Sequence, residues 1–452
     1  MKKNFFFTLL FLTFTLCLSA QINEKKRATF WHFGNQVGID FTCLPASFTG
    51  SQMNAFEGSA SISDTNGILQ FYTEGTTVWD RNNNVMPNGT GLLGNPSSVQ
   101  SAIITPHPGN PDHYFIFTTD AIWENNGVNG LQWHEVDMTL NGGFGDVISK
   151  NNQLIDRTQE KLVAVRNASS TGYWVVIQKS DPGSTSSSNV GSNVYHAYEV
   201  TAAGVNPTPV ISTTGPLVTW QSYGMYMSPQ GDVMVNIHPD LNVYDFNNAT
   251  GTLTHRWAAT ASPFVGNFEF SPDGNILYAC RNSEIFQFDL NAPNVGAFQA
   301  SQTQVSTTGV DVKALQLAPD CKLYGLASNG SALHSIDNPN VMGVGCGFTQ
   351  NAITFVSGTG SHALTNFCSS FFEFPCGNRL DFDVTGTNAS CNNDGTASVI
   401  NLVGTAPFSF SWSTGDTTQS ISNLGGGTYY VSVSDGSGCT IMDSVTISQP
   451  QT

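Results

Sequence analysis

Residues Phe268–Asp289 read FEFSPDGNILYACRNSEIFQFD and contain three short runs of alternating apolar and polar residues, separated by two turns. In the first turn, Ser271–Gly274, proline presets φ at the second position, and glycine supplies a positive φ that residues with a Cβ resist. The second turn is the polar stretch Arg281–Ser283. The pattern predicts a meander of three antiparallel strands.

The same meander recurs along the chain. Met225–Phe246 reads MYMSPQGDVMVNIHPDLNVYDF, and Leu315–Ile336 reads LQLAPDCKLYGLASNGSALHSI. The prolines Pro229, Pro272 and Pro319 lie 43 and 47 residues apart, a period at which four-stranded propeller blades repeat. Weaker copies of the meander are found at Ser61–Asp80, Ile103–Val136 and Leu162–Val200.

A seventh copy is divided between the two ends of this region. Phe30–Phe41 contains a second and a third strand without a first one, and His362–Cys368 is a first strand with no blade after it. We expect His362–Cys368 to pair with Phe30–Phe33 in one sheet, because a closed ring exposes no sheet edge. The sequence therefore predicts an all-β protein whose main domain, residues 21–376, is a seven-bladed β-propeller of the WD or YVTN type.

The N-terminus has the pattern of an export signal. A basic start, Met1–Lys3, precedes an apolar run of 14 residues, Phe5–Leu18, and a plausible cleavage site after Ala20. This run is too short for an ordinary transmembrane helix, and no later run is long enough, so we expect an extracellular or cell-surface protein without a transmembrane span. With 33 acidic against 16 basic side chains in the whole sequence, the surface repels phosphate backbones, which argues against a nucleic-acid partner.

Eight cysteines remain after removal of residues 1–20, an even number suited to an oxidising compartment. Cys321 in the first turn of its blade and Cys346 after the third strand fall on one face of the ring and are predicted to pair. Cys391 and Cys439 bracket the last region, and a disulfide between them would constrain the unfolded chain by about 4 kcal/mol. Cys368 with Cys376 is a weaker candidate pair, and Cys43 and Cys280 are expected to be free and buried.

The blade pattern stops at residues 371–379, and a second domain, residues 377–452, is expected to follow. Its alternating stretches ASVINLV, FSFSWS, QSISNL, TYYVSVSD and CTIMDSVTI predict short strands. Trp412 lies in mid-strand, where a small sandwich needs one large core residue. The sequence predicts a small Ig-like β-sandwich.

Several residues of this second domain resemble a known family. A Cys before Asn-Asp-Gly, then Pro-Phe-x-Phe-x-Trp, Ile-x-Asn-Leu, Gly-Thr-Tyr and a closing Gly-Cys-Thr resemble one SprB-type repeat, a module of Bacteroidetes cell-surface adhesins associated with gliding motility. The first 370 residues resemble the propeller regions that begin large secreted proteins of the same phylum, through FEGSASISDTNGILQFYTEGTTVWDRN, MPNGTGLLGNPSSVQSAII and VDMTLNGGFGDV.

The resemblance implies an exported protein of the type IX secretion class that acts in binding or adhesion. Such proteins usually continue into more repeats and a C-terminal sorting domain, whereas this sequence stops at Thr452. We therefore expect either that further domains are missing from this chain or that it reaches the surface by another route. No binding residue is carried over from the resemblance.

The sequence contains none of the common catalytic or cofactor motifs. Gly-x-Ser-x-Gly, His-Glu-x-x-His, a Walker loop and a Gly-x-Gly-x-x-Gly after a strand are all missing. Asp80–Val85 begins like a calcium loop, but Val85 stands where that loop needs glycine. We expect no enzyme activity, no cofactor and no metal site.

One candidate site follows from the repeat register. The first strand of each blade lines the channel of such propellers, and polar residues recur where these strands begin. The candidate ligand-binding residues are Glu57, Gln100, Glu160, Lys161, Tyr223, Asn267, Lys313 and His362, with Trp123 and Trp220 in nearby loops. Such a set suits an extracellular glycan or protein ligand, because apolar stacking and directed hydrogen bonds combine there.

Three other interpretations stay open at this level. The channel mouth of any propeller is wet and polar, so these residues are also compatible with no ligand. A secreted glycan-active enzyme would need Glu57 and Glu160 about 5 to 9.5 Å apart. A structural spacer fits the second domain better than the propeller.

Overall fold

The structure is a computed structural model of the chain. It describes residues 24–42, 46–122, 126–180, 192–218, 224–238, 240–259, 267–281, 284–307, 309–373, 380–390, 393–404, 406–436 and 440–449. The predicted export signal (residues 1–20), Trp123, Trp220 and Tyr223 lie outside these residues. The chain divides into two compact units, unit 1 with Met1–Asp40 and Phe48–Pro375, and unit 2 with Phe41–Ser47 and Cys376–Thr452.

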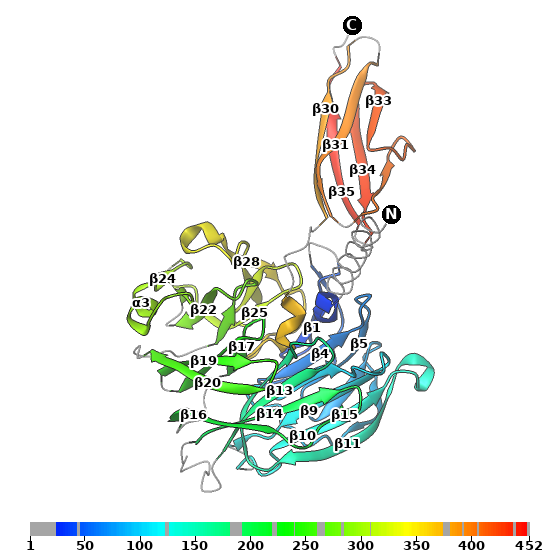
Figure 1. Ribbon diagram of the computed structural model, residues 1–452. Coiled ribbons are helices and arrows are strands. Elements are labelled where there is room, and N and C mark those ends of the chain that lie inside the picture. The colour runs from blue at the N-terminus through cyan, green and yellow to red at the C-terminus, as the bar shows by residue number, and fades with distance from the viewer. Residues whose placement is uncertain are drawn as a thin grey trace, which may run out of the picture. The chain divides into compact units, whose positions relative to one another are not determined.

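Unit 1 is built almost entirely of antiparallel strands (Figure 1). The strands up to Asn366 are β1 (Phe30–Phe33), β2 (Val37–Asp40), β3 (Ser47–Phe48), β4 (Ser59–Ser63), β5 (Leu69–Thr73), β6 (Thr77–Asp80), β7 (Val85–Thr90), β8 (Ala102–Pro106), β9 (His113–Thr119), β10 (Leu131–Asp137), β11 (Asp146–Ile155), β12 (Thr158–Arg166), β13 (Tyr173–Lys179), β14 (Ser192–Thr201), β15 (Gly204–Val205), β16 (Val210–Val218), β17 (Met225–Met227), β18 (Val233–His238), β19 (Asp240–Asn247), β20 (Thr252–Ala259), β21 (Phe268–Phe270), β22 (Ile276–Arg281), β23 (Glu284–Asp289), β24 (Thr303–Gln304), β25 (Val312–Leu317), β26 (Leu323–Ala327), β27 (Ala332–Ile336), β28 (Phe348–Thr354) and β29 (Thr365–Asn366).

Short helices complete the described part of unit 1. They are η1 (Lys25–Ala28), η2 (Asn141–Gly143), α3 (Val295–Ala300), η3 (Gly343–Cys346) and η4 (Ser369–Phe372). The side chain of Asn294 caps α3 by accepting a hydrogen bond from the Ala297 N–H. None of the helices in the described residues is long and apolar enough to cross a membrane.

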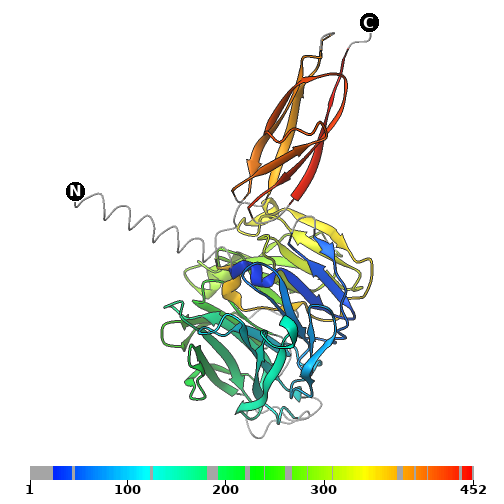
Figure 2. The same ribbon diagram turned by 90° about the vertical axis from the view of Figure 1, so that its right-hand side faces the viewer.

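The sheets of unit 1 form a β-propeller (Figures 1 and 2). Six of them contain four consecutive strands in meander order, beginning with β4, β8, β12, β17, β21 and β25. From β4 through β8, β12, β17 and β21 to β25, each first strand contacts the first strand of the next sheet, and β1 contacts β4. The seventh sheet is the three-stranded β1–β2–β3, and Trp31 of β1 packs edge-on against Tyr324 of β26 at a ring distance of 6.0 Å.

The meander that defined the repeat forms as predicted. In the first turn Gly274 has a φ of 73°, and its N–H donates to the Ser271 carbonyl. Phe268 and Phe270 of β21 are fully buried in a core that they share with Leu277, Ala279 and Phe288. Between them Glu269 is left half-buried, because alternate residues of a strand face opposite sides.

The ring closes differently from the prediction. Residues 365–366 form β29, which pairs in parallel with β4, not with β1. The split-blade pairing of His362–Cys368 with Phe30–Phe33 is therefore wrong. Side-chain hydroxyls explain the difference, because Ser59 Oγ and Thr365 Oγ1 both donate to the His32 carbonyl, at 2.9 and 3.0 Å. These two hydrogen bonds attach β4 and β29 to β1, although neither strand shares a sheet with β1.

The predicted disulfides also need correction. Cys346 is a free thiol buried in the core of its blade, whereas Cys321 lies in the β25–β26 turn and is disulfide-bonded, so the Cys321–Cys346 pairing is wrong. Cys368 is free and contacts Ser370 Oγ at 3.2 Å, which excludes its pairing with Cys376. Cys280 is free and buried as predicted. Cys43, Cys391 and Cys439 lie outside the described residues.

Unit 2 is a small β-sandwich. One sheet has the order β30 (Asp381–Thr387), β31 (Gly395–Val403), β33 (Ser420–Leu424), and the other has β32 (Ser409–Trp412), β34 (Gly427–Ser434), β35 (Thr440–Ile447). Trp412 is 3% exposed and shares its core with Val431 and Val433. Its indole N–H donates to the Thr418 carbonyl at 2.8 Å, which confirms Trp412 as the large core residue.

Candidate functional site

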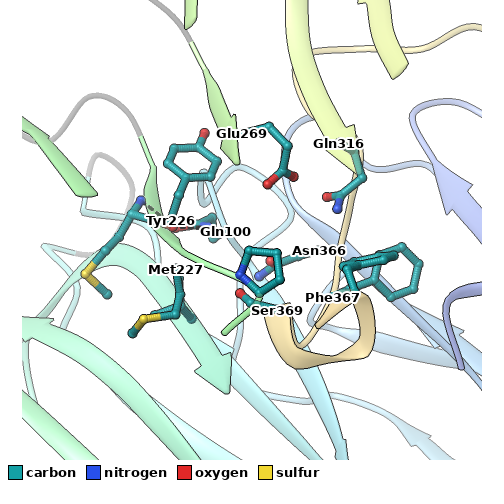
Figure 3. A pocket seen from close by; sticks show the side chains of 12 residues that line it. Gln100, Tyr226, Met227, Glu269, Gln316, Asn366, Phe367 and Ser369 are labelled. Atoms are coloured by element: carbon teal, nitrogen blue, oxygen red, sulfur yellow. Dashed lines mark hydrogen bonds between the residues drawn. The ribbon is translucent and has the colours of Figure 1, made fainter. Parts of the chain in front are cut away.

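The inner strands of the propeller enclose a cavity at the centre of the ring (Figure 3). Its wall includes Gln100, Tyr226, Glu269, Gln316 and Asn366. A second cavity shares four of these residues, all but Glu269, and reaches toward the points where the strands begin, at Gly58, Asn267 and Ala363. We call the two together the channel cavity, and the end where the strands begin its mouth.

The channel cavity is narrow. Each of its two parts has a volume of about 40 Å³, which is room for about three water molecules. A sugar ring or a peptide side chain therefore fits at the mouth and not inside the channel.

Polar groups along the wall are largely occupied with one another. The Gln100 amide donates to the Met225 carbonyl at 2.9 Å and accepts from the Met225 N–H at 3.0 Å, as a backbone unit of a sheet would. Tyr226 OH donates to Asn267 Oδ1 at 2.6 Å, and the Asn267 amide donates to the Lys313 carbonyl. Gln100 and Asn267 therefore join neighbouring strands and have a structural role.

The far end of the channel is covered by η4. Phe367, Ser369 and Phe372 line the channel cavity there. The segment is held in place because Ser370 Oγ accepts the Arg166 N–H at 3.0 Å. Glu24, next to η1, makes 3.0 Å ion pairs with both Arg27 and Arg166. Among the described residues, no helix comparable to η4 lines the mouth of the channel.

Two aromatic rings meet at the mouth. Phe56 is 53% exposed, and its ring lies 4.6 Å from that of His362. His362 is exposed, with Nδ1 3.1 Å from Ser361 Oγ and 3.3 Å from the Phe56 carbonyl. Phe56 was not among the predicted residues, although the sequence shows a phenylalanine directly before Glu57.

Two carboxyl groups come from nearby strand starts, Glu57 directly after Phe56 and Glu160 in β12. Burial raises the pKa of Glu57 to about 7. Burial also raises the pKa of Glu160 to about 7, opposed by hydrogen bonds from the N–H groups of Ile122 and Val99 and reinforced by the charge of Glu57. The charge of Glu57 thus acts on Glu160, although β8 lies between their strands β4 and β12.

Lys161 does not belong to the mouth. Its side chain is fully buried, and Nζ donates to Asn236 Oδ1 at 3.0 Å and to the Ile237 carbonyl at 3.3 Å. Since successive residues of a strand face opposite sides, the neighbour of Glu160 points between two blades. Burial lowers the pKa of Lys161 to about 7. This burial and these hydrogen bonds argue against the ligand-binding role predicted for Lys161.

Of the other predicted residues, Lys313 is half-buried at the start of β25. Trp123, Trp220 and Tyr223 lie outside the described residues, so their role stays a prediction. Within the described residues, no three His, Cys, Asp or Glu side chains form a metal-binding group.

Three residues that line the channel cavity were not among the predicted site residues. Tyr226, Glu269 and Gln316 each stand three residues before a repeat proline, in MYMSP, FEFSP and LQLAP. Tyr226 and Glu269 are each flanked by buried residues on both sides, and Gln316 lies between the buried Leu315 and Leu317. This register position would have identified them.

Comparisons with known proteins give structural similarity alone. No family model and no curated protein matches the chain. One similar solved structure is a proposed 6-phosphogluconolactonase from Bacteroides fragilis, with 10% identity and a TM-score of 0.45 over 75% of this chain and 98% of that one. Another is PorZ, a surface component of the type IX secretion system of Porphyromonas gingivalis, with 12% identity and a TM-score of 0.38 over 91% of this chain and 62% of that one. A third is Hsv2 from Kluyveromyces lactis, with 10% identity and a TM-score of 0.39 over 69% of this chain and 90% of that one. At these identities and TM-scores the similarities carry no information on the function of this chain.

Proposed function

We propose that this protein is an exported binding or adhesion protein, extracellular or at the cell surface, and that its ligand binds at the mouth of the propeller channel. The observation that supports this proposal is the ring pair of Phe56 and His362 beside Glu57. An exposed aromatic pair next to a carboxyl group combines stacking with directed hydrogen bonds.

The chemistry of the mouth favours a neutral glycan or a protein surface. Aromatic rings stack on the apolar faces of sugars, and carboxyl groups hydrogen-bond to hydroxyls. The formal net charge of −17 argues against a polyanionic ligand. Each hydrogen bond contributes about 0.5–1.5 kcal/mol net, so Glu57, Lys313 and His362 must act together with the rings.

The surface location rests on two sequence features. The N-terminal segment has the pattern of an export signal, and the second domain resembles a SprB-type adhesin repeat. Both features fit a protein of the gliding-motility and type IX secretion class.

A secreted glycan-active enzyme is the second candidate. Its support is the pair of Glu57 and Glu160, two neighbouring carboxyl groups whose pKa values both lie at about 7, the range of a general acid. Against it stands Glu160, which is 3% exposed and accepts the Ile122 N–H. A carboxyl group engaged in this way is poorly placed to reach a substrate.

A glycan array probed with the wild-type protein and its Phe56→Ser, Glu57→Gln and Lys313→Ala variants tests the proposal. We expect each change to weaken binding severalfold with a nearly unchanged melting temperature, because these side chains are partly exposed. Val344→Ser, at an 87% exposed residue of η3, is the matched control and should bind like the wild type.

Two results would contradict binding at the mouth. One is unchanged binding by Phe56→Ser and Glu57→Gln together. The other is full binding by a fragment of residues 380–452, which would assign the ligand to the sandwich. Hydrolysis of a polysaccharide that is lost in both Glu57→Gln and Glu160→Gln would favour the enzyme instead.

A further inference from the structure

Three repeats place an oxygen-bearing side chain at one level of the channel. Tyr226, Glu269 and Gln316 occupy the same register position of β17, β21 and β25, and all three line the channel cavity (Figure 3). Two further oxygen-bearing residues, Asn366 of β29 and Ser369 of η4, line the same cavity. Five separate elements therefore contribute oxygen atoms to one small space.

At this level of the channel, two amide side chains use their nitrogen atoms in hydrogen bonds to backbone carbonyls. Asn366 uses its amide nitrogen to donate to the Ala102 carbonyl at 3.1 Å, and Gln316 donates to the Leu317 carbonyl at 3.2 Å. Neither amide oxygen has a hydrogen-bond partner among the described residues. Both oxygens are consequently available as ligands.

Glu269 is held in a fixed orientation. One carboxylate oxygen accepts the Phe270 N–H at 2.8 Å, and the other accepts the Leu317 N–H at 3.1 Å. Each oxygen of an ionised carboxylate has more than one lone pair, so both can still bind a cation. No Lys or Arg lines either part of the channel cavity, which means that no described basic side chain lining the cavity balances this carboxylate.

We propose that the channel cavity binds one calcium ion through the carboxylate of Glu269 and the amide oxygens of Gln316 and Asn366. Calcium takes six to eight oxygen ligands, including carboxylates, amide carbonyls and water, in flexible geometry. The volume of the cavity accommodates an ion with a few water molecules. Magnesium, which demands near-ideal octahedral geometry, fits one carboxylate and two amides on three separate elements less well.

The affinity should be modest, because the site offers a single charged ligand. Extracellular calcium modules bind with a dissociation constant on the order of 10⁻⁴–10⁻³ M. Calcium here would join β21, β25 and β29 across the channel and would stabilise the ring. This inference is independent of the ligand at the mouth.

Isothermal titration of the chelator-treated full chain with calcium chloride tests the inference, together with melting curves in calcium and in magnesium. We expect one saturable site and a rise in melting temperature with calcium that magnesium reproduces only weakly. Glu269→Gln and Gln316→Met should each raise the dissociation constant about tenfold or more. Glu284→Gln, which changes a carboxyl group of the same blade outside the cavity, is the matched control.

Terbium luminescence gives a second measurement that does not depend on stability. Terbium bound in the cavity should be sensitised by Tyr226, so Tyr226→Phe should lower the emission while calcium still displaces the ion. The proposal is overturned if wild-type protein shows no saturable heat with calcium up to about 10 mM. It is equally overturned if Glu269→Gln and Gln316→Met bind calcium like the wild type, because the ion then binds elsewhere.

Discussion

The imidazole of His32 is fully buried and stacks on Tyr72 with a ring distance of 4.0 Å and nearly parallel planes. Neither ring nitrogen has a hydrogen-bond partner. Burial lowers the pKa of His32 to about 3, because a charged imidazolium cannot be solvated there. A single residue of the first strand thus links the stability of the propeller to pH.

We predict that His32→Phe reduces the acid sensitivity of the propeller. The folded-state pKa of about 3 lies below the ordinary value, so this histidine contributes stability above about pH 6.5 that is lost as pH falls toward 3. Phenylalanine keeps the stacking and removes two unpartnered nitrogens, each of which costs about 1–3 kcal/mol. Urea unfolding at pH 7 and pH 5 measures both effects.

His362→Phe is the control for this prediction, since His362 is exposed. It should lose as much stability as the wild type between the two pH values. An equal loss in His32→Phe would show that another group carries the acid sensitivity.

Residue-level predictions from the sequence succeeded where strand alternation decides the outcome and failed where a distant neighbour does. Trp412 could be assigned to the sandwich core because its strand alternates. Gln100 and Lys161 could not be assigned, because their partners Met225 and Asn236 lie 125 and 75 residues away. No local pattern indicates such a partner.

At the scale of elements, the blade that begins with β12 and the blade that begins with β17 are joined by a buried polar network. Lys161 of β12 donates to Asn236 of β18, whose amide donates to Gln178 Oε1 and Tyr195 OH, both at 2.9 Å. Tyr195 OH in turn donates to Tyr244 OH at 2.9 Å. The network fixes one blade against the next, and its only cationic member is Lys161.

We predict that Lys161→Met changes how stability responds to alkaline pH. The folded-state pKa of Lys161 is about 7, below the ordinary value of 10.5. Between about pH 7 and 10.5 the unfolded chain therefore binds more protons than the folded chain. As a result, the free energy of unfolding rises with pH in that window. Lys161→Met should remove this rise, measured by urea unfolding at pH 7 and pH 9. Lys322→Met, which breaks a partly exposed ion pair with Asp337, is the control and should retain the rise in stability. If the rise persists in Lys161→Met, it does not come from Lys161.

The element order was predictable, but the closure of the ring was not. Repeat periodicity and turn residues such as Gly274 indicate where blades begin and end. The pairing of β29 with β4 depends on the hydroxyls of Ser59 and Thr365 meeting at the His32 carbonyl. Because a strand of two residues offers almost no pattern, its partner is decided by the assembled fold.

At the scale of the whole molecule, the two units have separate hydrophobic cores. The sandwich core around Trp412 contains residues of unit 2 alone, and the propeller cores contain residues of unit 1 alone. Two units with separate cores unfold as separate cooperative transitions unless an interface couples them. In the sequence, the blade pattern ends at residues 371–379, but nothing there indicates that Phe41–Ser47 groups with the second unit.

We predict two transitions in scanning calorimetry, and that the double variant Cys391→Ser, Cys439→Ser moves one of them. If these cysteines pair as the sequence suggests, the disulfide contributes about 4 kcal/mol to the sandwich. For a domain of this size that corresponds to a fall of about 15 °C or more in its midpoint. The propeller transition serves as the internal control, because Cys321 and the free thiols of unit 1 are untouched. If neither transition moves in the double variant, Cys391 and Cys439 are not joined. A single transition in the wild type would mean that the two cores unfold together.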